Sequence, residues 1–254
     1  MRTFVITGAG TGMGRATAQT LATLNDVRLI LIGRREKNLS ETLELLPRRG
    51  DHMIGALDIR NSSEWKTFLQ DSNANDLNIS GVFANAGIGG ENHYGENDRW
   101  DDIISINLTG TYTTINELLP YIKKSSEAYR NIVITSSCLA RFGVPRYTAY
   151  CTAKSGLLGL TKSLAVELAP DKILVNAICP GWVETEMAKA GIQKLADIDG
   201  VSYEEGFKQQ MSYVPLNKIS QPEEIANLVK FLMTNEQTSM TGQALDINNG
   251  SYMN

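Results

Sequence analysis

Short apolar runs alternate along this 254-residue chain with longer stretches in which apolar positions recur at helical spacing. Most of the short runs are continuous rather than alternating, which is typical of strands buried on both faces of a parallel sheet. The pattern predicts strands at 3–7, 28–33, 52–58, 79–87, 131–137, 173–181 and 243–248. It predicts helices at 13–24, 38–46, 62–71, 98–123, 149–168 and 221–234, the last with Ser220 as its N-cap.

The strict alternation of strand and helix predicts an α/β fold, a single doubly wound parallel sheet of the Rossmann type. We find no linker, repeat or low-complexity segment, so we expect one domain over residues 1–254. One long piece, 182–216, looks irregular. A segment of that length inside a compact domain is usually a lid or binding loop, so we expect a late substrate loop there.

Composition excludes several classes of function. The net charge is −4, so no basic field favours nucleic acid or an anionic membrane. No apolar run reaches the ~18 residues of a membrane span, and strand-like residues begin at position 3, so we expect no leader sequence and a cytoplasmic protein. The cysteines are odd in number and lie in apolar segments, which favours reduced thiols, and the two isolated histidines predict no metal site.

A glycine-rich turn follows the first strand. Gly8, Gly10, Gly12 and Gly14 separate that strand from the first helix. Glycines at such a junction let backbone amides approach a phosphate, and the helix N-terminus adds a favourable dipole. A plain strand–helix turn would need only one or two of them, so four favour a dinucleotide site.

Tyr150 and Lys154 lie four positions apart in the apolar helix 149–168, and a helix places them on one face. A neighbouring cation lowers the pKa of a phenol, which suits acid/base catalysis. This spacing is common by chance, so the pair alone fits an ordinary surface pair better.

Several short motifs occur in order along the chain: "TGAGTGMG" at 7–14, "NAG" at 85–87, "INLTG" at 106–110, "ITSS" at 134–137, "YCTAK" at 150–154 and "CPGWVET" at 179–185. Together they resemble the short-chain dehydrogenase/reductase family over essentially the whole chain. The later segments look most like bacterial 3-oxoacyl reductases and polyketide ketoreductases. Two departures, "ANAG" for the usual "NNAG" and Met13 for Ile or Leu, remove no reacting group.

The resemblance implies a catalytic set of Asn107, Ser137, Tyr150 and Lys154. Tyr150 would exchange the proton, Ser137 would hold the carbonyl, Lys154 would bind the nicotinamide ribose, and Asn107 would hold a water beside Lys154. It also implies cofactor contacts from the glycine loop, from Asp58 to adenine, and from segments after later strands: Gly8, Thr11, Gly12, Met13, Gly14, Asp58, Asn85, Ala86, Gly87, Pro180, Gly181, Val183 and Thr185.

The residues after the second strand indicate which cofactor is used. A site for NAD usually places a carboxylate there, but this strand ends in Gly33, and Arg34 and Arg35 follow. Guanidinium groups make paired, charge-assisted hydrogen bonds to a phosphate. We therefore expect NADP (NADPH), with Glu36 as the residue that could serve NAD instead. Two arginines that merely solvate the next helix are the alternative.

The substrate site is less legible. By position, Leu139, Arg141, Tyr147, Trp182 and Met187 line it, with Ser137 and Tyr150. Reductases that act on carrier-protein thioesters often carry basic residues at two rim sites, which are Ala128 and Asp171 here. Docking of a carrier protein is therefore doubtful, although Arg130 and Lys172 lie nearby.

The leading interpretation is hydride transfer between NADP(H) and a carbonyl or secondary alcohol, with a 3-oxoacyl type of substrate. An NAD-dependent alcohol, polyol or sugar dehydrogenase is the alternative within enzymes. A non-catalytic dinucleotide sensor on the same fold is the third, and the intact Ser137, Tyr150 and Lys154 argue against it. The family resemblance also implies a homo-oligomer, a homotetramer. The apolar helices 103–122 and 149–168 could supply interfaces, and packing in the core of the domain is the alternative explanation of their pattern.

Overall fold

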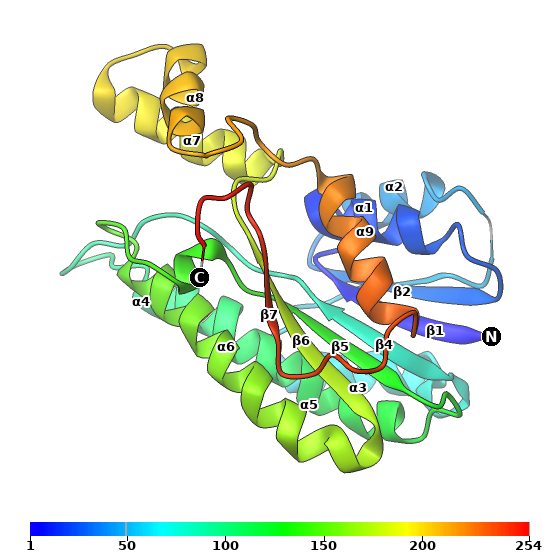
Figure 1. The fold of residues 1–254 in the computed structure, drawn as a ribbon. Helices are drawn as coiled ribbons and strands as arrows, with labels where there is room; N and C mark the ends of the chain where they lie inside the picture. Colours follow the sequence, from blue (N-terminus) through cyan, green and yellow to red (C-terminus); the bar gives the residue numbers. More distant parts are fainter. Residues whose placement is uncertain (49, 254) are drawn as a thin grey trace.

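The predicted strands form one parallel sheet in the computed structural model, which describes residues 1–48 and 50–253. Over these residues the sheet has seven strands in the order β3-β2-β1-β4-β5-β6-β7 (Figure 1). Their bounds are β1 Arg2–Thr7, β2 Val27–Gly33, β3 Met53–Ala56, β4 Ile79–Ala84, β5 Arg130–Thr135, β6 Ile173–Pro180 and β7 Ala244–Ile247. The order reverses between β1 and β4, and ligands of doubly wound sheets bind at the carboxyl ends of the strands beside such a reversal.

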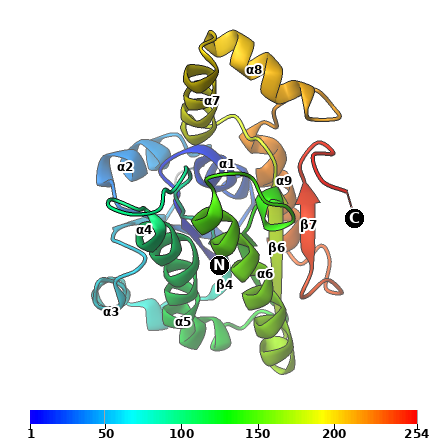
Figure 2. The same ribbon diagram turned by 90° about the vertical axis from the view of Figure 1, so that its left-hand side faces the viewer.

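Helices cover both faces of the sheet (Figures 1 and 2). One face carries α1 (Gly12–Leu21), α2 (Glu36–Glu44) and α9 (Pro222–Met233), and the other carries α3 (Ser62–Asp71), α5 (Gly110–Lys123) and α6 (Thr148–Leu168). Strand β1 shows why: Phe4 and Ile6 pack into the core on the α1 side, while Val5 packs into the core on the α5 side. All three side chains are fully buried, as the continuous apolar run predicts.

The predicted helix 98–123 is interrupted. It consists of α4 (Trp100–Ile104), a π-helical turn η2 (Ser105–Thr109) and α5. Asn107 lies in that turn and is fully buried. A π turn is a common feature of functional sites, and a pattern of apolar spacing does not reveal it.

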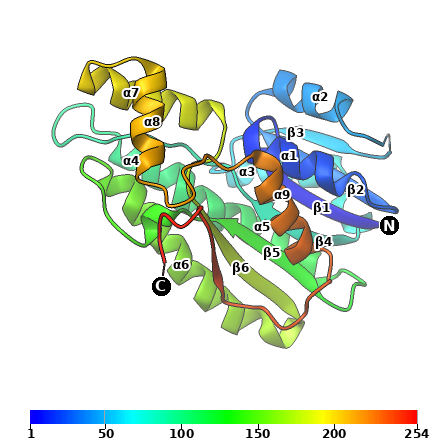
Figure 3. The same ribbon diagram turned by 45° about the horizontal axis from the view of Figure 1, so that its top comes forward.

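The segment 182–216 lies beyond the carboxyl edge of the sheet, as expected, but most of it is helical rather than irregular (Figure 3). It forms α7 (Glu186–Asp199) and α8 (Tyr203–Ser212), which pack on each other. The helix α7 buries Ala188, Ile192 and Ala196 at four-residue spacing. Small alanines gave too weak an apolar signal for the sequence to predict this hairpin, although Thr185 and Ser202 cap both helices.

The N-cap of α9 was predicted one residue too early. Gln221, not Ser220, is the N-cap, and it forms a capping box with Glu224. The Ser220 hydroxyl instead accepts a hydrogen bond from the Asn249 amide at 3.0 Å. Three short 3-10 turns complete the described secondary structure: η1 (Ala74–Asp76), η3 (Cys138–Ala140) and η4 (Ala169–Asp171).

Candidate active site

Several predicted strands end earlier than the sequence indicated, and this places candidate residues in loops at the carboxyl edge. Asp58 follows β3 by two residues, Asn85 follows β4 directly, and Ser137 lies two residues beyond β5. The glycine loop after β1 joins them at the same edge. The structure therefore brings the candidate residues that follow four separate strands to the carboxyl edge of the sheet.

The glycine loop has the backbone that the sequence predicts. Gly8 and Gly12 have φ angles of +66° and +51°, a left-handed region that side chains rarely adopt. Gly14 lies in α1 directly against the Gly8 carbonyl, where a side chain would not fit. Thr11 is the N-cap of α1, yet its side chain makes no cap hydrogen bond. The first amides of α1 thus lack a side-chain cap at the N-terminus, where a phosphate would bind.

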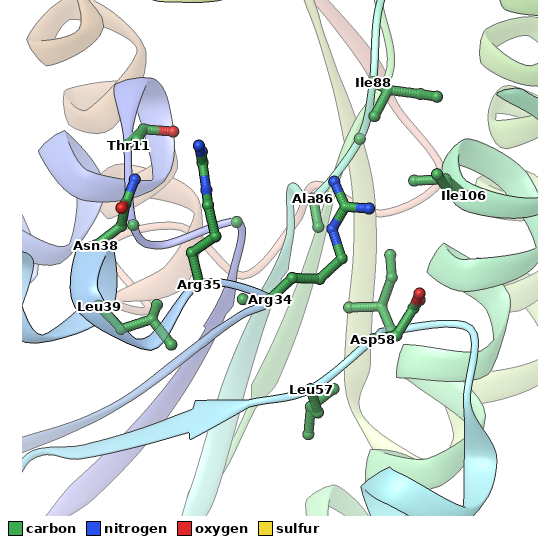
Figure 4. Close-up of a pocket in the computed structure, with 15 residues that line it drawn as sticks. Thr11, Arg34, Arg35, Asn38, Leu39, Leu57, Asp58, Ala86, Ile88 and Ile106 are labelled. Atoms are coloured by element: carbon green, nitrogen blue, oxygen red, sulfur yellow. The ribbon is translucent and has the colours of Figure 1, made fainter. Parts of the chain in front are cut away.

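A groove runs from this loop to the ends of β2 and β3. Its lining residues are Gly8, Gly10, Thr11, Gly33, Arg34, Arg35, Asn38, Leu39, Leu57, Asp58, Ile59, Ala86, Gly87, Ile88 and Ile106. Figure 4 shows Arg34 extending between Ala86 and Asp58, and Arg35 extending toward Thr11. Both guanidinium groups are exposed, and no described carboxylate pairs with either.

Asp58 is already engaged by a neighbour that sequence reasoning missed. Arg60 donates to both carboxylate oxygens of Asp58, at 3.0 Å and 2.7 Å. These hydrogen bonds, with a smaller effect from Arg34, hold the pKa of Asp58 below its ordinary value. The sequence "DIR" at 58–60 does not by itself show whether its two charged residues form an ion pair or lie apart on the surface.

Asn85 joins three strand ends. Its side-chain amide donates to the Thr7 carbonyl at 3.1 Å, and its side-chain oxygen accepts from the Thr135 hydroxyl at 3.2 Å. The Thr7 hydroxyl accepts from the backbone N–H groups of Asn85 and Ala86. The residues after β4 are therefore fixed against β1 and β5, with the small Ala86 and Gly87 facing the groove.

The four candidate catalytic residues also gather. Gly87 lies between Asn107 and Lys154. A Cβ atom at this position would overlap the Asn107 side-chain oxygen and would lie 3.7 Å from the Lys154 Nζ. The Asn107 side chain clasps Ile88: its Oδ1 accepts from the Ile88 N–H at 3.1 Å, and its Nδ2 donates to the Ile88 carbonyl at 2.9 Å. Asn107 thus holds the loop after β4 beside Lys154.

Tyr150 and Lys154 lie on one face of α6, as helical spacing requires. The Lys154 Nζ is 5.5 Å from the centroid of the Tyr150 ring and donates to the Thr135 carbonyl at 2.8 Å. Burial raises the pKa of Tyr150 to about 12, and this effect is larger than the lowering caused by its hydrogen bond with Ser137. Burial also lowers the pKa of Lys154 to about 8. The expected lowering of the phenol pKa is therefore not present in the chain alone.

The segment after β6 packs closely around the glycine loop. A side chain on Gly12 would lie 2.9 Å from the Thr185 methyl group, so these two residues are in contact. Pro180 ends β6, Gly181 lies against Asn248, and the side chain of Val183 is buried in the core on the α1 side. The side chain of Met13 packs against that same core, so neither side chain points into the groove.

Four of the candidate substrate residues lie near Ser137, Tyr150 or α7, and the fifth, Arg141, points elsewhere. Tyr147 contacts the Tyr150 ring edge-on at 6.3 Å, Met187 lies over Gly89, and Trp182 lies under α7. Leu139 is half-buried in η3, beside Ser137. Arg141 turns away, because its guanidinium pairs with Asp246 at 3.0 Å and donates to the Ala244 carbonyl. This placement favours an anchor between η3 and β7 over a substrate contact.

The described residues offer neither a membrane span nor a metal site. No helix among them combines the length and the apolar character that crossing a bilayer requires. No cluster of three or more histidine, cysteine or acidic side chains in this part of the chain could ligate a metal ion.

Comparisons with known proteins agree on one family. A family profile described as "Enoyl-(Acyl carrier protein) reductase" matches residues 8–252. The granaticin polyketide synthase putative ketoacyl reductase 1 of Streptomyces violaceoruber is 32% identical, over 97% of this chain and 91% of its own. A variant actinorhodin polyketide ketoreductase with NADPH has a TM-score of 0.91 at 31% identity, covering 98% and 97% of the two chains. A 3-oxoacyl-(acyl-carrier protein) reductase with bound NAD from Brucella melitensis has a TM-score of 0.83 at 30% identity, covering 100% and 92%.

Proposed function

The chain belongs to the short-chain dehydrogenase/reductase family of oxidoreductases, and from this premise we propose that it reduces a carbonyl group to a secondary alcohol with NADPH. The observation that carries the proposal is the gathering of Ser137, Tyr150 and Lys154 beside Gly87, in the loop that packs on Gly8. A dinucleotide sensor has no need of all three groups.

The residues at the edge fit a nicotinamide dinucleotide. The N-terminus of α1 would bind the pyrophosphate, the groove from Arg35 to Asp58 would bind the adenosine end, and Lys154 would bind the nicotinamide ribose. When bound, the cofactor supplies a hydride to the carbonyl carbon. The small Gly87 leaves room beside Lys154, because any side chain there would collide with Asn107.

The protein's own groups complete the reaction. Ser137 donates a hydrogen bond to the substrate carbonyl oxygen and holds it near the Tyr150 hydroxyl. Tyr150, whose raised pKa keeps it protonated, transfers its proton to that oxygen as the carbon receives hydride. The Lys154 ammonium then stabilises the phenolate, because it lies beside the ring and is held there by the Thr135 carbonyl.

We propose NADPH over NADH on the basis of Arg34 and Arg35. Both guanidinium groups line the groove, and Gly33 offers no carboxylate to repel a 2′-phosphate. We also propose that the substrate is a free small molecule of the 3-oxoacyl type. Asp171 pairs with Lys123 at 2.8 Å, and Arg130 donates to the carbonyls of Glu127 and Asp171. Arg130 is therefore engaged within the chain, and Ala128 and Asp171 offer no positive charge, which disfavours docking of an acidic carrier protein although Lys172 lies nearby.

A screen of the purified protein with NADPH and NADH tests the proposal. It would include 3-oxoacyl thioesters, enoyl thioesters, diketones, quinones and sugars. We expect NADPH oxidation with a keto substrate and none with an enoyl thioester. Tight NADPH binding without turnover on any carbonyl would support a sensor instead. Faster turnover of a polyol or sugar alcohol with NAD would support the dehydrogenase alternative.

A further inference from the structure

Glu91 is a buried carboxylate that the proposed chemistry does not use. It lies in the loop between β4 and α4, and its side chain is only 2% exposed. Its carboxylate pairs with the Lys194 Nζ at 2.6 Å and with the Arg146 guanidinium at 3.1 Å. A buried charge destabilises the folded state unless it is paired. Losing either partner would therefore leave the Glu91 carboxylate less well compensated.

The two partners of Glu91 come from two different elements, α7 and the segment before α6. Lys194 lies on α7, the first helix of the hairpin beyond the sheet edge, and Arg146 lies two residues before α6. Figure 3 shows α7 beside the loop that precedes α4. Burial raises the pKa of Glu91, but Lys194, Arg146 and His93 outweigh it and hold the pKa below its ordinary value. Glu91 therefore remains a carboxylate and links α7 to the loop between β4 and α4.

The next residue, Asn92, is also buried and supports α6 directly. Its Oδ1 accepts from the Ala149 N–H at 2.9 Å and from the Thr148 hydroxyl at 3.0 Å. Its own backbone N–H donates to the Arg146 carbonyl at 2.8 Å. The N-cap residue of α6, Tyr147, makes no side-chain cap bond, so Asn92 caps this helix from a distant loop.

These contacts reach the proposed acid. The capped Ala149 immediately precedes Tyr150, and the Tyr147 ring rests edge-on against the Tyr150 ring. Tyr147 also lies close enough to Glu91 for that carboxylate to contribute to raising its pKa, after the larger effect of burial. The dipeptide Glu91–Asn92 thus contacts α7 on one side and the first turn of α6 on the other.

We propose that Glu91 and Asn92 are positioning residues that couple the placement of α7 to the placement of Tyr150. Glu91 holds α7 through Lys194, and Asn92 fixes the first turn of α6. Any displacement of α7 therefore bears on the same loop that sets the position of the phenol. The kinetic part of this inference rests on the proposed reductase function, and the structural part does not.

The test uses two lysines on the same helix. Lys194→Met removes the tie to Glu91, whereas Lys189→Met removes an exposed pair with Glu186 and is the matched control. Amide hydrogen exchange of the cofactor-free protein reports on α7 directly. We expect exchange over 186–199 to be about five-fold faster in Lys194→Met and unchanged in Lys189→Met. Adding Glu91→Gln to Lys194→Met should accelerate it by less than Glu91→Gln does alone.

Kinetics separate positioning from general stability. Lys194→Met should raise KM for the keto substrate about five-fold, lower kcat about three-fold and speed exchange in the first turn of α6, with NADPH affinity nearly unchanged. Asn92→Ala should lower kcat about ten-fold and speed exchange in the first turn of α6. Asn92→Asp should restore only part of the exchange protection, because its carboxylate still caps the helix but faces Asp98, to which the Asn92 amide donates at 3.1 Å.

Equal α7 exchange in the two lysine variants would overturn the tie, and an unaltered kcat in Asn92→Ala would overturn the link to Tyr150. If no carbonyl is turned over by the unmodified protein, the reductase function fails. The exchange measurements over α7 and the first turn of α6 then decide the coupling alone.

Discussion

The Lys154 ammonium lies 5.5 Å from the centroid of the Tyr150 ring and donates its hydrogen bond to the Thr135 carbonyl, not to the phenol. Burial raises the pKa of Tyr150 to about 12 and lowers that of Lys154 to about 8. At neutral pH the phenol is therefore protonated and the lysine is still mostly an ammonium. Ligands that bring further charge and hydrogen bonds would stabilise the phenolate that proton transfer leaves behind.

Tyr150→Phe tests the proton donor. The variant keeps the ring and its contact with Tyr147 but loses the hydroxyl. We expect turnover to fall by ~10²-fold or more while NADPH binding is retained. The exposed Tyr213, changed to Phe, serves as the control and should behave as the unmodified protein. Near-normal turnover in a folded Tyr150→Phe protein would remove the assignment.

Lys154→Met tests the cost of the buried ammonium. The folded-state pKa of about 8 lies below the ordinary Lys value of ~10.4, so between these pH values the unfolded chain binds more protons than the folded one. The contribution of Lys154 to stability must then rise with pH across that window, by on the order of 2–3 kcal/mol.

Denaturant unfolding of the cofactor-free protein at pH 7 and pH 9.5 measures this. Relative to the unmodified protein, Lys154→Met should be most stable at pH 7 and should lose more than half of that advantage by pH 9.5. The same variant should be inactive. A stability difference that is independent of pH would show that Lys154 titrates normally.

The sequence predicts this fold well because its information is local. Continuous apolar runs such as 28–33 mark strands buried on both faces, and the glycine loop marks the edge where ligands bind. The hairpin α7–α8 was missed because it buries mainly alanines, whose pattern is weak. The contacts of Asp58 with Arg60, of Arg141 with Asp246 and of Glu91 with Lys194 could not be predicted. Each depends on where a flexible charged side chain turns after the chain has folded.

Asn107→Ala tests the clasp on Ile88. The side chain is fully buried and satisfies both the N–H and the carbonyl of Ile88, while its amide also donates to the Ile103 carbonyl at 3.0 Å. Its removal leaves buried backbone groups unpaired, at about 1–3 kcal/mol each. We expect a loss of about 2–4 kcal/mol in the free energy of unfolding together with reduced turnover. A variant that loses turnover but keeps full stability would favour the expected role of holding a water.

The oligomeric state can be tested on the face formed by α4, α5 and α6. Trp100, Tyr112 and Val166 expose 39%, 52% and 79% of their surface on these helices. Apolar side chains of this size favour burial against a second copy, and we propose a homotetramer. Sedimentation at micromolar concentration should show a tetramer that Tyr112→Glu weakens and Tyr213→Glu does not. A stable monomer of the unmodified protein would contradict this.

Arg34 is the sharpest test of cofactor preference. Its guanidinium lines the groove between Ala86 and Asp58, and no described carboxylate holds it in an ion pair (Figure 4). A 2′-phosphate there would gain paired, charge-assisted hydrogen bonds, so Arg34→Ala should lose about 1.5–3 kcal/mol of NADPH binding with little effect on NADH. Lys37→Ala removes an exposed charge from α2, which begins two residues after Arg34, and controls for the overall field. Titration of both cofactors measures the difference directly. If the unmodified enzyme uses NADH as efficiently as NADPH, the arginines do not select the phosphate, and Glu36 becomes the residue to examine for ribose binding.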